Sequence, residues 1–495
     1  MITKEDIVKS VPQKGFVGHP KGLSTLFFTE FWERFSYYGM RAILLYFMYY
    51  SLNDGGLGLD RTTANSIFAI YGSLVYMSGI IGGWIADRVL GTRRTVFYGG
   101  VLIMLGHICL AFPGGLTMLL ISMVFIVMGT GLLKPNVSSI VGDIYAESDN
   151  RRDAGFSIFY MGINLGSFIA PLIVGTIGQK YSFHLGFGVA AVGMFVGLVM
   201  YVITAKKYLG LAGKQINNPL TKDEFSKLAI KTIIGVAIVA VLAVIAYIND
   251  QLTINNVILF ISILGILIPT AFFVVMYRSP KTNAEEKSRV LAYIPMFIAA
   301  VMFWAIQEQG SNILGTYADS RTDLNLGPIK LESSWFQSLN PLFIITMAPL
   351  FAWIWMKLGT RQPSTPVKFS LALFFSGLSF IVMVIPAFLS GGTALVSPWW
   401  LVLSFFLVVI GELLISPVGL SVTTKLAPKA FSAQTMSLWF LTSAAAQAVN
   451  AQLVKIFDKI SEVAYFGTIG TASVLLGIVM LVISPMISKA MQGIR

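Results

Sequence analysis

The stretch Glu30-Phe31-Trp32-Glu33-Arg34-Phe35-Ser36-Tyr37-Tyr38-Gly39-Met40-Arg41 lies inside an apolar run, residues 23–50, that is long enough to cross a bilayer. A charge at the centre of such a helix costs about 2.5–3.5 kcal/mol on insertion scales. The polar side chains follow the spacing i, i+3, i+4, i+7, i+8, i+11 and therefore share one helix face: Glu30, Glu33, Arg34, Tyr37, Tyr38 and Arg41. We expect this polar stripe to face a protein interior or a watery cavity.

Composition indicates a protein with many membrane spans. The 495-residue chain is 56% hydrophobic and 12% charged, whereas about 25% of residues are charged in ordinary soluble domains. The net charge of +12 does not predict nucleic-acid binding, because the basic residues sit in short loops rather than in one patch. Three histidines and one cysteine make a metal site unexpected.

Fourteen apolar segments are predicted to be membrane-spanning helices, in groups of six, two and six. They cover residues 22–51, 62–88, 92–112, 116–144, 152–180, 183–208, 229–249, 252–277, 288–318, 332–358, 366–390, 396–426, 430–457 and 464–490. The predicted domains are an N-terminal six-helix bundle (1–208), a linker with two additional helices (209–285) and a C-terminal six-helix bundle (286–495).

The loops predict the orientation. With the N-terminus inside, 26 of the 35 Lys and Arg residues lie in inner loops and six in outer loops, so we expect both termini to be cytoplasmic. Short matches between the halves, such as Leu90-Gly91-Thr92-Arg93 with Leu358-Gly359-Thr360-Arg361 and Phe31-Trp32 with Phe303-Trp304, suggest two related bundles. Related halves of this kind place a substrate site between them, near the bilayer midplane.

A helix rise of about 1.5 Å per residue turns each span into a depth ruler. Arg41 and Glu308 then lie at matching depth near the outer mouth, at roughly 28 and 30 Å from the inner ends of their spans. An inner layer is predicted to contain the remaining charges: Glu30, Glu33, Arg34, Lys134 and Glu412. Two layers drawn from opposite halves suit an alternating-access carrier, whereas permanent ion pairs that only hold the bundle together remain the alternative.

The motifs resemble a known family. Gly83-Trp84-Ile85-Ala86-Asp87-Arg88, followed by Gly91-Thr92-Arg93-Arg94, is similar to the cytoplasmic loop motif of the major facilitator superfamily. The opening stretch and Phe159-Tyr160-Met161-Gly162-Ile163-Asn164-Leu165-Gly166-Ser167 resemble, more narrowly, the proton-coupled oligopeptide transporter family. The resemblance covers the whole chain, including the inserted helix pair seen in bacterial members. It implies an all-α membrane protein with the major facilitator fold, in a bacterial cytoplasmic membrane.

A small peptide is a zwitterion, so its carrier needs a cation and an anion a few ångströms apart. We expect Glu412 to bind the amine, and Lys134 with Arg41 to bind the carboxylate, which an arginine can grip with two hydrogen bonds. The resemblance adds Asn164 and Asn340 as hydrogen-bonding partners of the peptide. It also implies a pocket whose aromatic and hydroxyl side chains accept many peptides: Tyr37, Tyr38, Tyr76, Trp304, Ser416 and Trp439.

Energy coupling is expected to run through carboxylates beside cations, since protonation changes how strongly a carboxylate holds a cation. Glu308 is the favoured candidate, because its protonation would release Arg41 for the peptide. Glu30 and Glu33, near Arg34 and Lys134, are second candidates, and static pairing remains an interpretation for Arg34. The expected partners are di- and tripeptides, protons and membrane lipid. No cofactor beyond the proton is expected, and a monomer suffices.

Two other function classes remain open from the sequence. A carrier of the same fold could transport another small solute, such as nitrate or a drug-like molecule, but such an anion would have no amine for Glu412. A membrane-embedded enzyme or a sensor is disfavoured, because the sequence contains no nucleophile–base pair, metal cluster or soluble domain that would support it.

Overall fold

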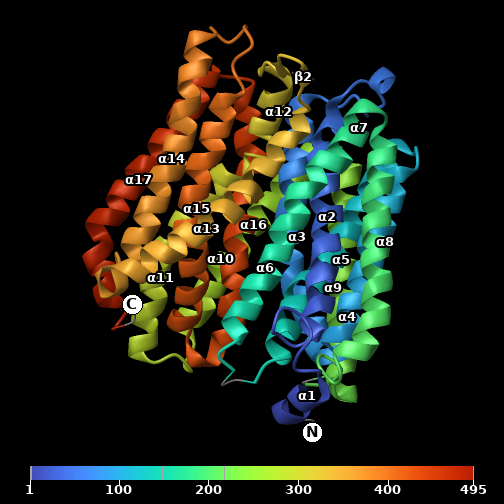
Figure 1. The fold of residues 1–495 in the computed structure, drawn as a ribbon, viewed down its shortest axis with the longest axis vertical. Helices are drawn as coiled ribbons and strands as arrows, with labels where there is room; N and C mark the ends of the chain where they lie inside the picture. Colours follow the sequence, from blue (N-terminus) through green and yellow to red (C-terminus); the bar gives the residue numbers. More distant parts are fainter. Residues whose placement is uncertain (1–2, 147–148, 217, 494–495) are drawn as a thin grey trace.

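Long helices that run along the longest axis build the protein, as the computed structural model of residues 3–146, 149–216 and 218–493 shows (Figure 1). Twelve helical segments of these residues are long and apolar enough to cross a membrane. Two further helices, α2 (Gly22–Tyr49) and α16 (Ser432–Phe457), are 28 and 26 residues long. All fourteen predicted segments thus contain a long helix, which confirms the predicted helical membrane fold.

The N-terminal helices pack closely through glycines. A Cβ on Gly82 would lie 1.8 Å from the carbonyl oxygen of Gly131, and one on Gly99 would lie 2.7 Å from that of Gly129. Small residues of this kind let membrane helices approach one another. Besides α2, this half contains α1 (Lys4–Ser10), η1 (Leu52–Asp54), α3 (Arg61–Ile85), η2 (Ala86–Leu90), α4 (Thr92–Ala111), α5 (Gly115–Asp143), α6 (Arg152–Ala170), η3 (Pro171–Gly175), α7 (Thr176–Lys180) and α8 (Phe183–Tyr208).

The C-terminal half contains a short antiparallel hairpin in addition to its helices. In the hairpin Asn325 pairs with Lys330 and Leu326 with Ile329. Besides α16, the elements are α11 (Ala284–Glu308), α12 (Ile313–Ser320), β1 (Asn325–Leu326), β2 (Ile329–Lys330), η4 (Ser333–Ser338), α13 (Leu339–Leu358), η5 (Gly359–Arg361), α14 (Thr365–Leu389), α15 (Trp399–Leu426), η6 (Lys429–Phe431) and α17 (Glu462–Ala490).

The predicted single helix over 288–318 is wrong, because α11 ends at Glu308 and α12 begins only at Ile313. Side-chain hydrogen bonds compete with the helix at this point. The Gln309 amide donates to Asn450 at 3.0 Å and accepts from the Tyr465 hydroxyl at 2.8 Å. The Asn312 side chain accepts from the backbone of Ile313 at 2.5 Å. The break leaves Glu308 as the last residue of its helix.

The inserted pair, α9 (Lys222–Ile248) and α10 (Ile254–Arg278), differs in how its two members pack. No residue of α9 is buried against the rest of the described chain. In contrast, α10 packs against α3 of one half and α16 of the other. A Cβ on Gly265 would lie 2.6 Å from Ala448 on α16 and 3.4 Å from the Ser73 hydroxyl on α3. The second inserted helix therefore covers a seam between the halves.

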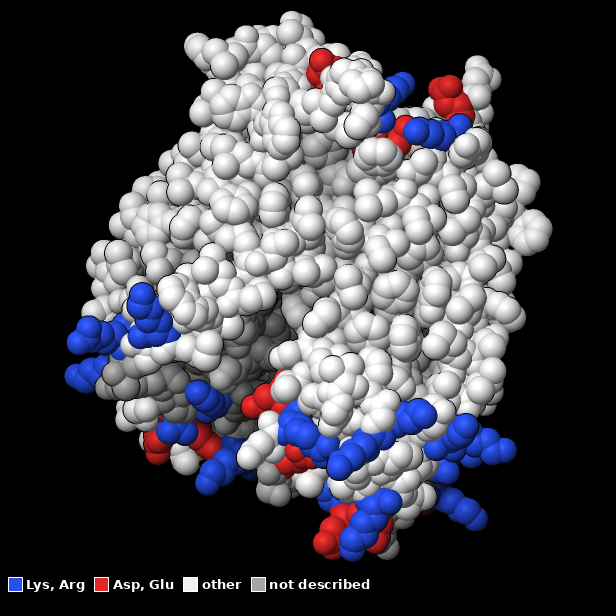
Figure 2. All heavy atoms as spheres, viewed as in Figure 1, with Lys and Arg blue, Asp and Glu red and all other residues white. Residues whose placement is uncertain are grey.

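The two ends of the molecule differ in charge. Both chain termini lie toward the lower end of Figure 1, and Lys and Arg gather at that end on the face in Figure 2. We call this the basic end. The β1–β2 hairpin and α12 lie at the opposite end, which we call the far end (Figure 1).

Candidate functional site

Arg41 and Glu308 form a buried ion pair between the two halves. The Nη2 atom of Arg41 on α2 lies 2.5 Å from Oε2 of Glu308 on α11. Their side chains are 7% and 5% exposed. The structure therefore brings together the two residues that the depth ruler places at the same level.

The Glu308 carboxylate accepts two more hydrogen bonds. The hydroxyl of Tyr76 on α3 donates to Oε1 at 2.8 Å, and the amide of Gln447 on α16 donates to Oε2 at 2.7 Å. Donors from α2, α3 and α16 thus converge on one carboxylate. Sequence reasoning placed Tyr76 in the peptide pocket, and it missed Gln447, because a neutral amide within a helix gives no pattern that names its partner.

Glu30, Glu33 and Arg34 form a cluster within α2. The Nε atom of Arg34 lies 3.0 Å from a carboxylate oxygen of Glu30 and also contacts Glu33. All three side chains are buried. The guanidinium also lies over two aromatic rings, 5.4 Å from the centre of Tyr37 and 5.9 Å from that of Tyr38. The charges on this helix are therefore paired within the helix itself.

Lys134 does not join this cluster by direct contact. None of the ion pairs among the described residues includes Lys134. Its Nζ lies 5.0 Å from the centre of the Tyr76 ring, as in a cation–π contact. Because the hydroxyl of the same tyrosine bonds to Glu308, Tyr76 connects Lys134 to the Arg41–Glu308 pair.

Glu412 on α15 faces neutral amides. Its Oε2 accepts from Asn340 on α13 at 2.9 Å and from Gln307 on α11 at 3.5 Å. Within the described ranges it has no basic partner at ion-pair distance. The prediction that Glu412 belongs to the inner layer is wrong, because Gln307 directly precedes Glu308 and places Glu412 near that level. The ruler erred because it assumed straight helices with known ends.

The remaining predicted pocket residues vary in their surroundings. Asn164 is buried and donates to the Tyr160 carbonyl of its own helix at 2.9 Å. The indole nitrogen of Trp304 is buried without a hydrogen-bond partner in the part of the chain that the structure describes. Ser416 is half-buried. The ring of Trp439 packs on the α15 backbone, where a Cβ on Gly419 would lie 2.0 Å from it.

Hydrogen bonds close the far end between the two halves. The hydroxyls of Tyr49 and Tyr50 donate to Asp319 at 2.6 and 2.7 Å. Gln179 donates to Ser333 at 2.7 Å, and the Trp335 indole donates to Thr176 at 2.9 Å. On the other side, Figure 2 shows a hollow between the halves toward the basic end. The charged cluster is therefore shut off from the far end.

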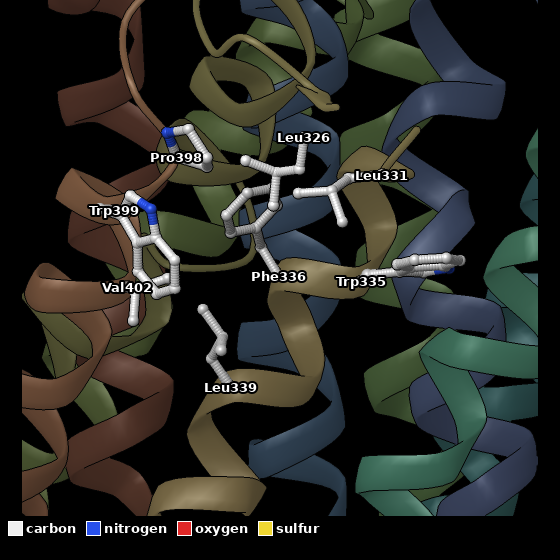
Figure 3. A pocket seen from close by; sticks show the side chains of 8 residues that line it. All are labelled: Leu326, Leu331, Trp335, Phe336, Leu339, Pro398, Trp399 and Val402. Atoms are coloured by element: carbon white, nitrogen blue, oxygen red, sulfur yellow. The ribbon is translucent and has the colours of Figure 1, made fainter. Parts of the chain in front are cut away.

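An apolar pocket at the far end lies apart from these charges (Figure 3). It opens between η4, α13 and the start of α15, and none of the predicted site residues lines it. Its lining side chains are Leu326, Leu331, Trp335, Phe336, Leu339, Pro398, Trp399 and Val402. Because the lining offers no charged partner for a zwitterion, the candidate site is the charged cluster between the halves.

Comparison with known proteins gives consistent matches over the whole chain. A family model described as the POT family matches residues 93–474. A di-/tripeptide transporter of Lactococcus lactis subsp. cremoris is 47% identical over 494 residues, which cover 98% of this chain and 99% of that protein. A crystal structure of a peptide transporter, POT, in complex with sulfate is 66% identical, covers 100% of both chains and has a TM-score of 0.97. A POT family transporter in complex with a thioalcohol-conjugated peptide is 48% identical, with a TM-score of 0.93 and coverage of 97% and 100%.

Proposed function

This chain belongs to the POT family and is a peptide transporter, and we propose that it imports di- and tripeptides across the bacterial cytoplasmic membrane by symport with protons. One observation carries the proton coupling. The buried Glu308 carboxylate receives donors from α2, α3 and α16, that is, from both halves. A single proton on this group changes contacts across the seam.

Protonation of Glu308 removes the charge that holds Arg41. The guanidinium then needs another anion, and the carboxylate of an incoming peptide provides one with suitable geometry. The same step weakens one of the contacts that close the far end. Proton binding and peptide binding thus favour each other, which is the requirement for symport.

The peptide ends are held by opposite halves in this proposal. Glu412 binds the ammonium group, because it is a buried carboxylate whose described partners are neutral amides. Asn340 orients that carboxylate. Arg41 and Lys134 bind the peptide carboxylate, and Asn164 bonds to the peptide backbone. The pocket side chains surround the peptide: Tyr37, Tyr38, Tyr76, Trp304, Ser416 and Trp439.

The cluster of Glu30, Glu33 and Arg34 acts at the second gate. Its members are paired within α2 and lie on the same helix as Arg41. A proton on either glutamate frees part of the Arg34 charge and alters the field at Lys134. This cluster then responds when the basic side opens or closes.

We place the basic end in the cytoplasm, because Lys and Arg are enriched in cytoplasmic loops. Both termini are then cytoplasmic, and the far end faces outward. The bundles 1–208 and 286–495 rock about the site, with 209–285 as an inserted linker. The transporter works as a monomer, since both ends of the peptide clamp come from one chain.

Uptake into liposomes of purified protein tests the proposal. Labelled dialanine should accumulate when the outside is more acidic than the inside. Unlabelled tripeptides should compete, whereas free amino acids and nitrate should not. Accumulation without a pH gradient would contradict proton symport, and strong competition by nitrate would favour a carrier for another solute.

A further inference from the structure

Gln447 contacts Glu308 but has no role in the transport steps above. It is fully buried on α16, and its Nε2 donates to Oε2 of Glu308 at 2.7 Å. Its other polar atom, Oε1, is buried without a hydrogen-bond partner among the described residues. An unpaired acceptor inside a membrane protein is costly, because no lipid group can replace the missing bond.

The backbone around Gln447 is held in place, so that its side chain is the part free to rearrange. One turn earlier on α16, the Ala444 carbonyl accepts from Ser73 on α3 at 2.8 Å. Opposite the amide, a Cβ on Gly72 would lie 2.7 Å from Nε2 and 3.3 Å from Cγ of Gln447. The glycine therefore provides the space that the amide occupies.

Several charged or titratable groups surround Glu308. Arg41 on α2 and Tyr76 on α3 touch its carboxylate. Further groups on α2, α5 and α15 lie near enough to interact with it electrostatically: Tyr37, Tyr38, Lys134 and Glu412. Of the three donors on the carboxylate, only the Gln447 side chain can also accept a hydrogen bond through a second atom on the same planar group.

We propose that Gln447 is a positioning residue that binds Glu308 in both of its protonation states. It donates through Nε2 to the carboxylate and, after a half-turn of its amide, accepts through Oε1 from the protonated carboxyl. The inference rests on the proposed coupling role of Glu308.

The proton step balances without any other reactant. A proton from water forms an O–H bond on the Glu308 carboxylate, and the ion pair with Arg41 is lost. Rotation about the last side-chain bond of Gln447 exchanges Nε2 and Oε1, so the unpaired acceptor receives the new O–H. The carboxyl is thereby kept on α16 while Arg41 turns to the peptide.

The variant Gln447→Met keeps the length of the side chain and removes both hydrogen-bonding functions. The carboxylate form of Glu308 loses a charge-assisted bond and the acid form loses a weaker neutral one, so the acid form gains in relative stability. The external pH for half-maximal dialanine uptake should therefore rise, by about 0.5–1 pH unit. Gln447→Asn, whose amide is one methylene too short, should shift it in the same direction.

The matched control is Gln452→Met on the same helix, because the Gln452 amide donates to Ser262 on α10 rather than to Glu308. Its pH profile should equal that of the wild type. In the Glu308→Gln background, adding Gln447→Met should leave the pH dependence of peptide counterflow unchanged, since the group that Gln447 binds no longer titrates.

Three results would overturn the inference. They are an unchanged half-maximal pH in Gln447→Met, a uniform loss of rate at every pH, and a shift that persists without Glu308. The failure of the proposed function looks different, because Glu308→Gln alone would then retain full gradient-driven uptake, and this result would overturn both statements.

Discussion

Arg41 and Glu308 are 267 positions apart in the chain, and their side chains meet at 2.5 Å across the seam between the two halves. The contact is buried, so breaking it without a replacement leaves an unpaired charge in a low-dielectric site. A proton on one partner and a peptide carboxylate on the other together supply that replacement. The pair is therefore suited to separate only when both ligands are present.

Glu308→Gln should uncouple transport from the proton gradient. The amide keeps the size of the side chain but has no titratable group, so a pH gradient no longer drives the change at the seam. We expect accumulation of dialanine to fall to simple equilibration, while counterflow of labelled against unlabelled peptide continues. Accumulation above equilibration would exclude Glu308 from the coupling step. Glu285→Gln on the same helix is the control, because Glu285 is an exposed partner of Arg289.

Glu412→Gln should remove the recognition of the peptide amine. A hydrogen bond to a charged group contributes about 1.5–3 kcal/mol, which corresponds to a loss of roughly 10- to 100-fold in dialanine affinity. N-acetyl-dialanine has no ammonium group, so its weak competition should be the same in wild type and variant. Competition assays with both peptides measure the difference. An equal loss for both peptides would show that Glu412 shapes the pocket without binding the amine.

The sequence predicts the fold and the main ion pair because both depend on strong local signals. Apolar length marks the spans, and the matching depths of Arg41 and Glu308 pair them correctly. The helix break at residues 309–312 escapes prediction, since it depends on Asn450 and Tyr465, which come from distant helices. Gln447 escapes for a similar reason. Its partner is decided by how α16 lies against α3 and α11, which no spacing along α16 reveals.

The level of Glu412 shows a second limit. A ruler based on rise per residue needs the true end of the span and its tilt, and neither is available from composition. In the structure α15 begins at Trp399, and Glu412 bonds to Asn340 and Gln307. Neutral amides complete this site, and they are the residues for which pattern and charge give the least information.

Asp319→Asn should weaken the closure of the far end. Asp319 accepts from Tyr49 and Tyr50 at 2.6 and 2.7 Å, and the neutral amide loses the charge in both bonds. A loss of about 1.4 kcal/mol shifts the population tenfold toward the open far end. Ser66→Cys, at a fully buried position of α3, reports this by maleimide labelling in the Cys109→Ser background.

Asp323→Asn controls for the loss of charge near the hairpin, since the Asp323 carboxylate accepts from Asn325 close by in sequence rather than from the other half. Its labelling rate at Ser66→Cys should match that of the parent protein. Equal labelling in the Asp319→Asn and Asp323→Asn variants would show that Asp319 does not hold the far end shut.

Gly72→Ala should change the pH profile through Gln447 without touching any titratable group. The new methyl would lie 2.7 Å from the Gln447 amide nitrogen, which is closer than a carbon and a nitrogen can approach, so the amide must leave its place beside Glu308. The carboxylate then loses one donor, and the pH for half-maximal uptake should rise by about 0.5 unit. Gly79→Ala is the matched control on α3, because nothing lies within 4 Å of its new methyl. Both substitutions gain about 0.8–1.0 kcal/mol of helix propensity, so a shift in Gly72→Ala alone would come from the contact with Gln447. Equal profiles for the two variants would mean that the amide keeps its bond to Glu308 by moving with it.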